Sequence, residues 1–251
     1  RGSDELTDLG KEFNNMTDIL RRTEESRRQF VSDASHELKT PVASIRLLTD
    51  SILQNENIDR ETTMEFVGDI GESAARLQRL SEKLLDLSRL DSGAVRQEVP
   101  VDLSQAARKA VRMLAPLAAE KEVALTLDAP EPVHILAGED DVSQILFNLA
   151  ENAVKYNIPG GTVTLTVRKG ARAMLTVVDT GIGIPEEDLP HIFSRFYRVD
   201  KARSREAGGS GLGLSIVRDA VDLYGGSIEV WPNHPRGTVF EVMFPVCERE
   251  I

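Results

Sequence analysis

The stretch Ser35-His36-Glu37-Leu38-Lys39-Thr40-Pro41 lies inside a long helical pattern near the start of the sequence. The apolar residues around it recur at steps of three and four, which places one stripe of a helix against a partner; they are Val31, Ala34, Leu38, Val42, Ile45 and Ile52. His36 falls on the opposite side, where it should face water, and Thr40 shares that side one turn later. Pro41 cannot hydrogen-bond to the carbonyl of Glu37, so the helix can bend beside the histidine.

Composition limits what this chain can do. It has 251 residues, a net charge of −11 and 41% apolar residues, which is normal for a soluble protein of one large or two modest domains. No run of residues approaches the roughly 18 apolar residues that cross a bilayer. The acidic charge argues against a general nucleic-acid binder, which would carry a basic stripe. Cys247 is the single cysteine and lies in no metal-binding motif, which fits a reducing compartment.

The first third of the sequence reads as two helices. Its opening seam alternates steps of three and four, as in a coiled coil, through Leu6, Leu9, Phe13, Met16 and Leu20. Thr23 and Arg27 weaken the seam before it resumes, which predicts a loosely held coupling between two better helices. A polar turn at 54–57 precedes a second apolar stripe from about Arg60 to Leu90. Because such an antiparallel hairpin has little core of its own, we expect it to dimerise into a four-helix bundle.

The pattern changes from helix alone to mixed helix and strand after a linker at 94–100. We expect helices at 104–121, 140–156 and 211–224, and strands at 123–127, 162–167, 175–178, 227–231 and 238–246. Strands that include hairpins, separated by helices, predict a mixed sheet with helices on one face, an α/β sandwich.

One predicted helix in this second part carries a polar face suited to a nucleotide. Asn148, Asn152 and Lys155 lie at i, i+4 and i+7, with Glu151 and Tyr156 beside them. Amide and carboxylate oxygens suit Mg²⁺, and the ammonium group suits phosphate. A solvated helix face is the ordinary alternative.

Three further segments also have features that suit a nucleotide. Asp179-Thr-Gly-Ile-Gly-Ile-Pro185 follows a strand, where a carboxylate can accept hydrogen bonds from an exocyclic amine. Gly208–Gly213 opens a helix, where free N–H groups favour phosphate. No strand precedes these glycines, so they do not form a dinucleotide-binding fingerprint, and the sequence has no Walker-type loop. Residues 186–207 combine aromatic and basic side chains, as in a lid. Taken singly, these segments are also explained as a turn, a helix start and a solvated loop.

Taken together and in this order, the segments resemble the N, G1, F and G2 boxes of the histidine-kinase ATP-binding domain. The segments are Asn148-Leu-Ala-Glu-Asn-Ala-Val-Lys-Tyr156, Asp179-x-Gly-x-Gly183, Phe193-x-x-Phe196 and Gly209-x-Gly-x-Gly213. Ser35 to Pro41 resembles the H box of the same family, and Asp4-Glu5-Leu6 through Asn14-Asn15-Met16 resembles the end of a HAMP module. The resemblance implies four parts: 1–22 as the end of HAMP, 23–93 as the dimerisation and phosphotransfer hairpin, 94–100 as the linker, and 101–251 as a Bergerat-type ATP-binding domain.

The resemblance implies that His36 is the phosphoacceptor. An imidazole is mostly neutral near pH 7 and is therefore already a nucleophile. Glu37 would accept the proton of the other ring nitrogen and set the tautomer. Thr40 matches the position that supports phosphatase activity in the family, by orienting water toward a phosphorylated response regulator.

The resemblance also implies a site for ATP and Mg²⁺. Lys155, Arg195 and Arg198 would meet phosphate, and Asp179 would bind the adenine amine. The residues assigned to the nucleotide are Asn148, Asn152, Lys155, Tyr156, Asp179, Gly181, Gly183, Arg195, Arg198, Gly209, Gly211 and Gly213, and those assigned to Mg²⁺ are Asn152, Asn148 and Glu151.

The implied activity is ATP-dependent autophosphorylation of His36 and transfer of the phosphoryl group to an aspartate of a response regulator. The expected partners are a second copy of the chain and that regulator's receiver domain, with no nucleic acid. We expect this part to be soluble and to face the cytoplasm, with membrane attachment only through segments that the sequence does not include. Two alternatives remain: a clamp-type ATPase of the same nucleotide-binding superfamily, and a dimeric signalling scaffold without activity.

Overall fold

The computed structural model describes residues 2–55, 58–91, 97–199 and 209–247. The chain divides into two compact units, Arg1–Ser81 and Glu82–Ile251, and each is described by itself. Among the described residues, no helix is both long enough and apolar enough to cross a membrane. Residues 94–96 of the predicted linker and the basic residues Lys201, Arg203 and Arg205 lie outside the described ranges.

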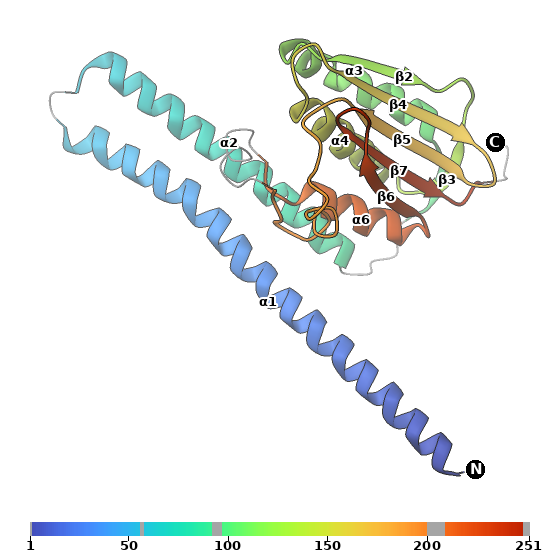
Figure 1. The fold of residues 1–251 in the computed structure, drawn as a ribbon. Coiled ribbons are helices and arrows are strands. Elements are labelled where there is room, and N and C mark those ends of the chain that lie inside the picture. Colours follow the sequence, from blue (N-terminus) through green and yellow to red (C-terminus); the bar gives the residue numbers. More distant parts are fainter. Residues whose placement is uncertain (1, 56–57, 92–96, 200–208, 248–251) are drawn as a thin grey trace. The chain divides into compact units, whose positions relative to one another are not determined.

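The first unit is the greater part of an antiparallel helical hairpin, as predicted (Figure 1), and the last ten residues of the second helix belong to the second unit. Helix α1 spans Gly2–Gln54 and continues through the buried Pro41, and α2 spans Arg60–Asp91. Asp59 caps α2: its Oδ1 accepts the Thr62 N–H at 2.8 Å and its Oδ2 accepts the Thr62 hydroxyl at 2.8 Å. These hydrogen bonds lower the pKa of Asp59, and they explain why the second helix begins at Arg60.

The second unit is built on a five-stranded sheet with the order β2-β4-β5-β7-β6. Its strands are β2 (Ala124–Asp128), β4 (Thr162–Lys169), β5 (Ala173–Asp179), β6 (Ser227–Pro232) and β7 (Thr238–Phe244). Only the β2–β4 pair is parallel; the other pairs are antiparallel. The sheet is therefore mixed, as predicted.

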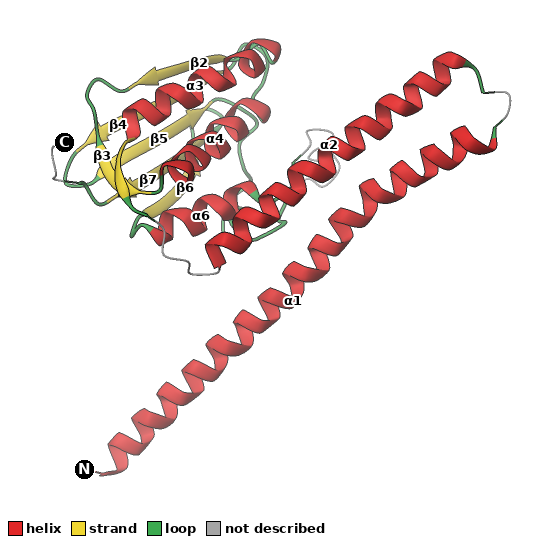
Figure 2. Cartoon of the chain, turned by 180° about the vertical axis from the view of Figure 1, so that it is seen from behind, coloured by secondary structure: helices red, strands yellow, loops and turns green. Residues whose placement is uncertain are grey.

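Three helices cover one face of this sheet (Figure 2). They are α3 (Leu103–Glu120), α4 (Glu139–Lys155) and α6 (Gly213–Leu223). Alternate residues of the central strands point into the layer between sheet and helices, and Val163, Leu165, Val167, Leu175 and Val177 are fully buried there. This burial confirms the predicted α/β sandwich and leaves the ends of β5 and α4 to form a site.

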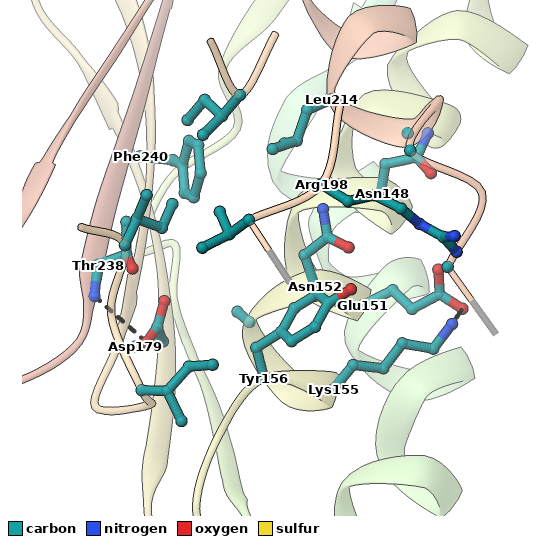
Figure 3. A pocket seen from close by; sticks show the side chains of 18 of the residues that line it. Asn148, Glu151, Asn152, Lys155, Tyr156, Asp179, Arg198, Leu214, Thr238 and Phe240 are labelled. Atoms are coloured by element: carbon teal, nitrogen blue, oxygen red, sulfur yellow. Dashed lines mark hydrogen bonds and ion pairs between the residues drawn. The ribbon is translucent and has the colours of Figure 1, made fainter. Parts of the chain in front are cut away.

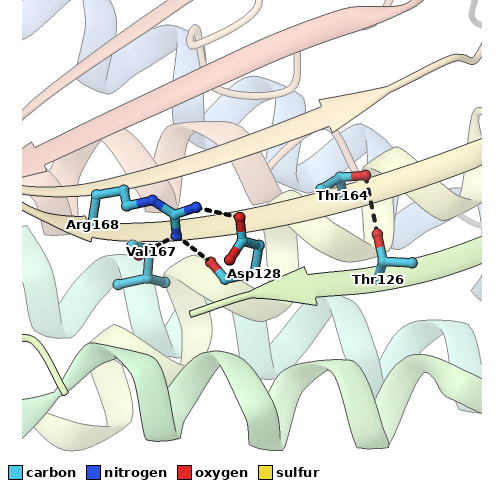
Figure 4. A network of polar contacts seen from close by, with 5 residues as sticks. All are labelled: Thr126, Asp128, Thr164, Val167 and Arg168. Carbon is cyan, nitrogen blue, oxygen red and sulfur yellow. Dashed lines mark hydrogen bonds and ion pairs between the residues drawn. The ribbon is translucent and has the colours of Figure 1, made fainter. Parts of the chain in front are cut away.

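The parallel edge of the sheet is held by polar contacts (Figure 4). The Thr126 and Thr164 hydroxyls lie 3.1 Å apart across the β2–β4 pair. Arg168 donates from Nη1 to the Asp128 carbonyl at 2.9 Å and from Nη2 to the Asp128 carboxylate. These contacts stabilise the edge strand β2, whose pairing with β4 is the only parallel one among the described strands.

Two short strands escaped the sequence analysis. β1 (Val99–Asp102) and β3 (His134–Ala137) pair antiparallel, outside the main sheet. Residues 99 and 100, which were predicted to belong to the linker, thus lie in β1. A four-residue strand has too few alternations to be recognised, and Pro100 within it argues against a strand.

Candidate active site

The second unit contains a cavity of about 490 Å³, within the usual size range of ligand pockets. Five segments far apart in the sequence supply most of its lining (Figure 3). They are α4, the end of β5 with the loop after it, residues 192–199, the start of α6, and the start of β7; Lys83 of α2 also lines the cavity. The predicted residues that line it are Asn148, Glu151, Asn152, Lys155, Tyr156, Asp179, Gly183, Arg198, Gly209, Gly211 and Gly213. Gly181 and Arg195 do not belong to this lining.

Helix α4 presents the polar face that the sequence predicted. Its apolar stripe, which includes Ile145 and Leu149, is buried in the core, so the neighbouring Asn148 and Asn152 line the cavity. Asn148 is only 5% exposed and sits against the start of α6, where a methyl group on Gly213 would lie 3.1 Å from Asn148 Oδ1. The amide is therefore held in place by packing between α4 and α6.

The last turns of α4 add charged groups to the same wall. Lys155 Nζ pairs with Glu151 Oε1 at 2.9 Å, and both side chains are about three-quarters or more buried. The ion pair brings one ammonium and one carboxylate to a cavity that also contains two amides. This set of groups can bind phosphate and, through oxygen ligands, a hard cation.

Asp179 ends strand β5 at the cavity and is 7% exposed. Its Oδ1 accepts the Gly181 N–H at 2.8 Å and the Thr238 N–H at 3.3 Å. Burial raises the pKa of Asp179 despite these hydrogen bonds, which favour the charged form. A buried carboxylate of this kind is suited to a ligand that donates hydrogen bonds.

Gly181 supports this loop from behind, not from within the cavity. A methyl group at its Cα would lie 2.4 Å from the Tyr156 carbonyl oxygen, and that oxygen accepts the Ile182 N–H at 3.0 Å. The close approach fastens the loop after β5 to the end of α4. Gly181 therefore shapes the site indirectly.

The segment with two phenylalanines packs against α6 and β7. The Phe193 ring meets the Phe240 ring edge-on at 6.5 Å between centroids, and the Arg218 guanidinium lies 4.4 Å from the Phe193 centroid. Phe196 has a positive φ of 62°, which is rare for its residue type, and its N–H donates to the Gly211 carbonyl at 2.9 Å. The segment is thus attached to the glycine-rich start of α6.

The two predicted phosphate-binding arginines of this segment occupy different places. Arg198 lines the cavity. Arg195 Nη2 instead pairs with Asp219 Oδ2 of α6 at 2.9 Å, so its predicted place beside phosphate is not supported. The sequence shows a cluster of basic residues, but it does not show that Asp219 of α6 pairs with Arg195.

The start of β7 forms a further part of the site that was not predicted from the sequence. Thr238 and Phe240 line the cavity, and Gly237 fits so closely that a methyl group there would lie 2.0 Å from the Asp179 carbonyl oxygen. The available signal was a glycine directly before a strand, which often marks a close approach of two backbones.

The helical hairpin places the H-box residues as follows. His36 and Thr40 are exposed on α1, and the Thr40 hydroxyl donates to the His36 carbonyl at 3.2 Å. Glu37 turns to the flank of the helix, where its Oε2 accepts from Arg76 Nη2 of α2 at 3.2 Å. The hairpin therefore leaves the imidazole accessible and anchors the carboxylate beside it.

Two family models match the chain. Residues 26–93 match the His Kinase A (phospho-acceptor) domain, and residues 137–248 match the histidine kinase-, DNA gyrase B-, and HSP90-like ATPase family. The first match contains the H box, and the second contains the whole described cavity wall from α4 to β7.

Curated relatives extend over nearly the whole chain. The sensor histidine kinase YkoH of Bacillus subtilis strain 168 is 35% identical over 244 residues, which cover 97% of this chain and 53% of the relative. The signal transduction histidine-protein kinase ArlS of Staphylococcus aureus strain USA300 is 33% identical over 96% of this chain and 54% of the relative. The chain thus spans about half the length of the curated relatives it matches.

Solved structures agree on the fold. Full-length ShkA in complex with AMPPNP has a TM-score of 0.65 and 28% identity over 89% of this chain and 47% of that one. Histidine kinase ThkA in complex with the response regulator protein TrrA has a TM-score of 0.71 over 91% of this chain and 65% of that one, and its 22% identity makes this a likeness of fold. Matches to both domains in the expected order, with relatives along nearly the whole chain, show that this chain belongs to the sensor histidine kinases.

Proposed function

We propose that this chain is the catalytic part of an ATP-dependent protein histidine kinase that phosphorylates its own His36 and passes the phosphoryl group to an aspartate of a response regulator. The cavity between α4, the end of β5 and the start of α6 carries this proposal. It joins a buried carboxylate, two amides, an ammonium group and a glycine-rich helix start, which together can bind adenine and phosphates.

The same cavity fits a magnesium ion. Mg²⁺ prefers a few protein oxygens together with water and phosphate oxygens, and Asn148, Asn152 and Glu151 supply oxygens at one wall. In the described part of the chain, no group of three or more histidine, cysteine or acidic residues could form an all-protein metal site. When bound with ATP, Mg²⁺ would neutralise charge on the phosphates.

The phosphoryl transfer asks mainly for positioning and charge stabilisation. A ring nitrogen of His36 attacks the γ-phosphorus, the bond from that phosphorus to the β–γ bridging oxygen breaks, and ADP leaves. Glu37 takes the proton that the other ring nitrogen loses, as the family resemblance implies. Lys155 and Arg198 stabilise phosphate charge from the cavity wall.

We also propose a homodimer. Apolar side chains lie exposed on the hairpin in the single chain, among them Val31 and Val42 of the predicted stripe on α1 and Val67 on α2. Such a stripe is stable when a second copy of the hairpin buries it in a four-helix bundle. The match to the phospho-acceptor domain supports the same arrangement.

The phosphorylated regulator is the second proposed partner, and Thr40 gives the enzyme a phosphatase activity toward it. The exposed hydroxyl of Thr40 lies one turn from His36 and can orient a water molecule. Replacing it as Thr40→Ala should keep autophosphorylation and remove the phosphatase activity. Normal dephosphorylation of the regulator by this variant would refute the role of Thr40.

Localisation is the last part of the proposal. One relative, YkoH, is named a sensor histidine kinase, and about half of its length lies outside the matched segment. We propose that the full-length protein is attached to the cell membrane and that this part faces the cytoplasm, where ATP is available.

The main proposal is tested by incubating the chain with Mg²⁺ and ATP that carries a radioactive γ-phosphate. We expect an acid-labile phosphate on the chain that His36→Ala removes, while Thr40→Ala serves as a neighbouring control that keeps the label. Labelling that survives His36→Ala would refute the acceptor. ATP hydrolysis without labelling would favour a clamp-type ATPase, and nucleotide binding without either would favour a scaffold.

A mixed dimer extends this test to the assembly. One subunit carries His36→Ala and the other carries Asn152→Asp, so neither can both bind ATP and accept phosphate. The wild-type dimer, which should be labelled, is the control. Label on the mixed dimer shows transfer between subunits, and no label on the mixed dimer shows transfer within one subunit.

A further inference from the structure

Arg76 of α2 makes an ion pair that no motif in the sequence indicates. Its Nη2 lies 3.2 Å from Glu37 Oε2 of α1, and the two residues are 39 positions apart in the sequence. The side chains are 26% and 23% exposed. The pair therefore links the two helices at the residue that follows His36, in a partly desolvated position.

This pair differs from three ion pairs that lie within α1. Arg21–Asp18, Arg28–Glu24 and Arg46–Asp50 each join residues three or four positions apart on α1, and every one of those side chains is at least 50% exposed. Exposed pairs within one helix contribute little, because water screens them. A pair between helices at half that exposure fixes its members more strongly.

Its location also sets it apart. At about 100° per residue, Glu37 is turned from the solvent-facing side of His36 toward the flank of α1, where α2 packs. A free glutamate side chain would sample several rotamers beside the imidazole. A guanidinium that holds one carboxylate oxygen restricts the carboxylate to one of these positions.

We propose that Arg76 is a positioning residue for the phosphorylation of His36: it holds the Glu37 carboxylate at the flank of α1 so that the carboxylate is in place when the imidazole loses its proton. The inference rests on the proposed function, in which Glu37 takes that proton. Arg76 touches neither ATP nor the imidazole in this role, and it acts only through Glu37.

Lysine and glutamine at position 76 separate the charge of the ion pair from the shape of the guanidinium group. A lysine at position 76 would keep the positive charge but would bind the carboxylate as a point charge and fix its orientation less well. A glutamine would remove the charge while keeping a hydrogen-bond donor. The series arginine, lysine, glutamine should therefore give decreasing control over Glu37.

The experiment measures autophosphorylation of the full chain with Arg76→Lys and Arg76→Gln, each with and without Glu37→Gln. A positioned general base contributes about 10²–10⁴-fold, so loss of its positioning by Arg76→Gln should lower kcat about tenfold. The KM for ATP should change less than about twofold, because Arg76 does not belong to the nucleotide cavity. Arg76→Lys should fall between the wild type and Arg76→Gln.

The double variant separates positioning from a merely structural role. In the Glu37→Gln background, Arg76→Gln should lower kcat less than about twofold, because the residue it positions no longer acts as a base. An equal tenfold loss in both backgrounds would overturn the proposal, and so would no loss in the wild-type background. Helix content by circular dichroism and dimer mass by light scattering identify a variant whose hairpin has unfolded. If Arg76→Gln unfolds the hairpin, the kcat of Arg76→Lys with and without Glu37→Gln tests the proposal instead.

Arg79→Gln is the matched control, since Arg79 is an exposed arginine on the same helix, three positions further along. It should leave kcat and KM unchanged, and a loss equal to that of Arg76→Gln would refute a specific role of Arg76. If the wild-type chain carries no label at all, the proposed function fails. If the wild type is labelled and Arg76→Gln matches it, only the inference about Arg76 fails.

Discussion

Replacing Gly211 by alanine tests how the phenylalanine segment is attached to the nucleotide cavity. Gly211 has a φ of +71°, and a methyl group on it would lie 2.7–2.9 Å from the backbone atoms of Phe196. Alanine in the left-handed region costs about 1–2 kcal/mol. The methyl group also forces Phe196 away and weakens its 2.9 Å hydrogen bond to the Gly211 carbonyl, which adds about 0.5–1.5 kcal/mol.

We therefore expect Gly211→Ala to destabilise the ATP-binding unit by about 1.5–3.5 kcal/mol and to lower its Tm by roughly 3–14 °C. The affinity for ATP should also fall, because the displaced segment carries Arg198 into the cavity wall. Thermal unfolding of the full chain and calorimetric titration with a non-hydrolysable ATP analogue measure the two effects.

Gly160→Ala is the matched control for backbone conformation. Gly160 has a φ of +75°, and a methyl group on it would meet no atom within 4 Å, so this change carries the conformational cost alone, about 1–2 kcal/mol. If Gly211→Ala is no more destabilising than Gly160→Ala and binds the analogue as tightly as the wild type, the attachment of Phe196 to Gly211 does not shape the site.

Four further substitutions have distinct expected results. Asp179→Asn should abolish ATP binding yet stabilise the ligand-free chain near neutral pH. Burial raises the pKa of Asp179 in the folded chain. The stability that the protonated carboxyl contributes is therefore fully present below its ordinary pKa and is lost as the pH rises through the raised pKa. The difference in Tm between this variant and the wild type should disappear toward acid pH, and a variant that is less stable at neutral pH would contradict the argument. Arg198→Ala should raise the KM for ATP about tenfold, because Arg198 lines the cavity. Arg195→Ala loses an ion pair with a partly exposed carboxylate, so it should cost about 0.5–1 kcal/mol of stability and leave the KM unchanged. Gly71→Ala should stabilise the hairpin by about 1 kcal/mol in denaturant unfolding, because its methyl group would meet no atom within 4 Å inside α2, and a destabilised variant would show that the position is packed against another subunit.

The elements that the sequence predicted well are those with enough turns or alternations to repeat a pattern. Helix α2 begins at Arg60 as expected, because Asp59 supplies the cap and the apolar stripe follows. Strand β4 alternates strictly between buried and partly exposed residues, and the structure extends the predicted strand only to Thr162–Lys169. The polar wall of α4 followed from the same reasoning, since its buried stripe fixes which face is free.

The features that escaped prediction depend on contacts between distant segments. Arg76 and Arg195 both find carboxylate partners on other elements, Glu37 and Asp219, and nothing local in the sequence marks those pairs. Gly237 was missed because its role is set by the Asp179 carbonyl, 58 positions earlier in the sequence. Periodicity reports which face of an element is buried, but not what lies opposite it.

Backbone contacts explain why separate glycine-bearing segments act as one site. Gly181 approaches the Tyr156 carbonyl, and Gly237 approaches the Asp179 carbonyl, each more closely than any side chain allows. A side chain that meets another side chain can change rotamer, whereas one that meets a carbonyl must move a whole segment. Adding one methyl group at either glycine would therefore displace the end of α4 or of β5, the two places where Asn152 and Asp179 face the nucleotide cavity. The two glycines therefore keep the walls of the cavity in their positions relative to one another. Their contribution to ATP binding comes from the backbone positions that they allow, and it needs no contact between the glycines and the ligand.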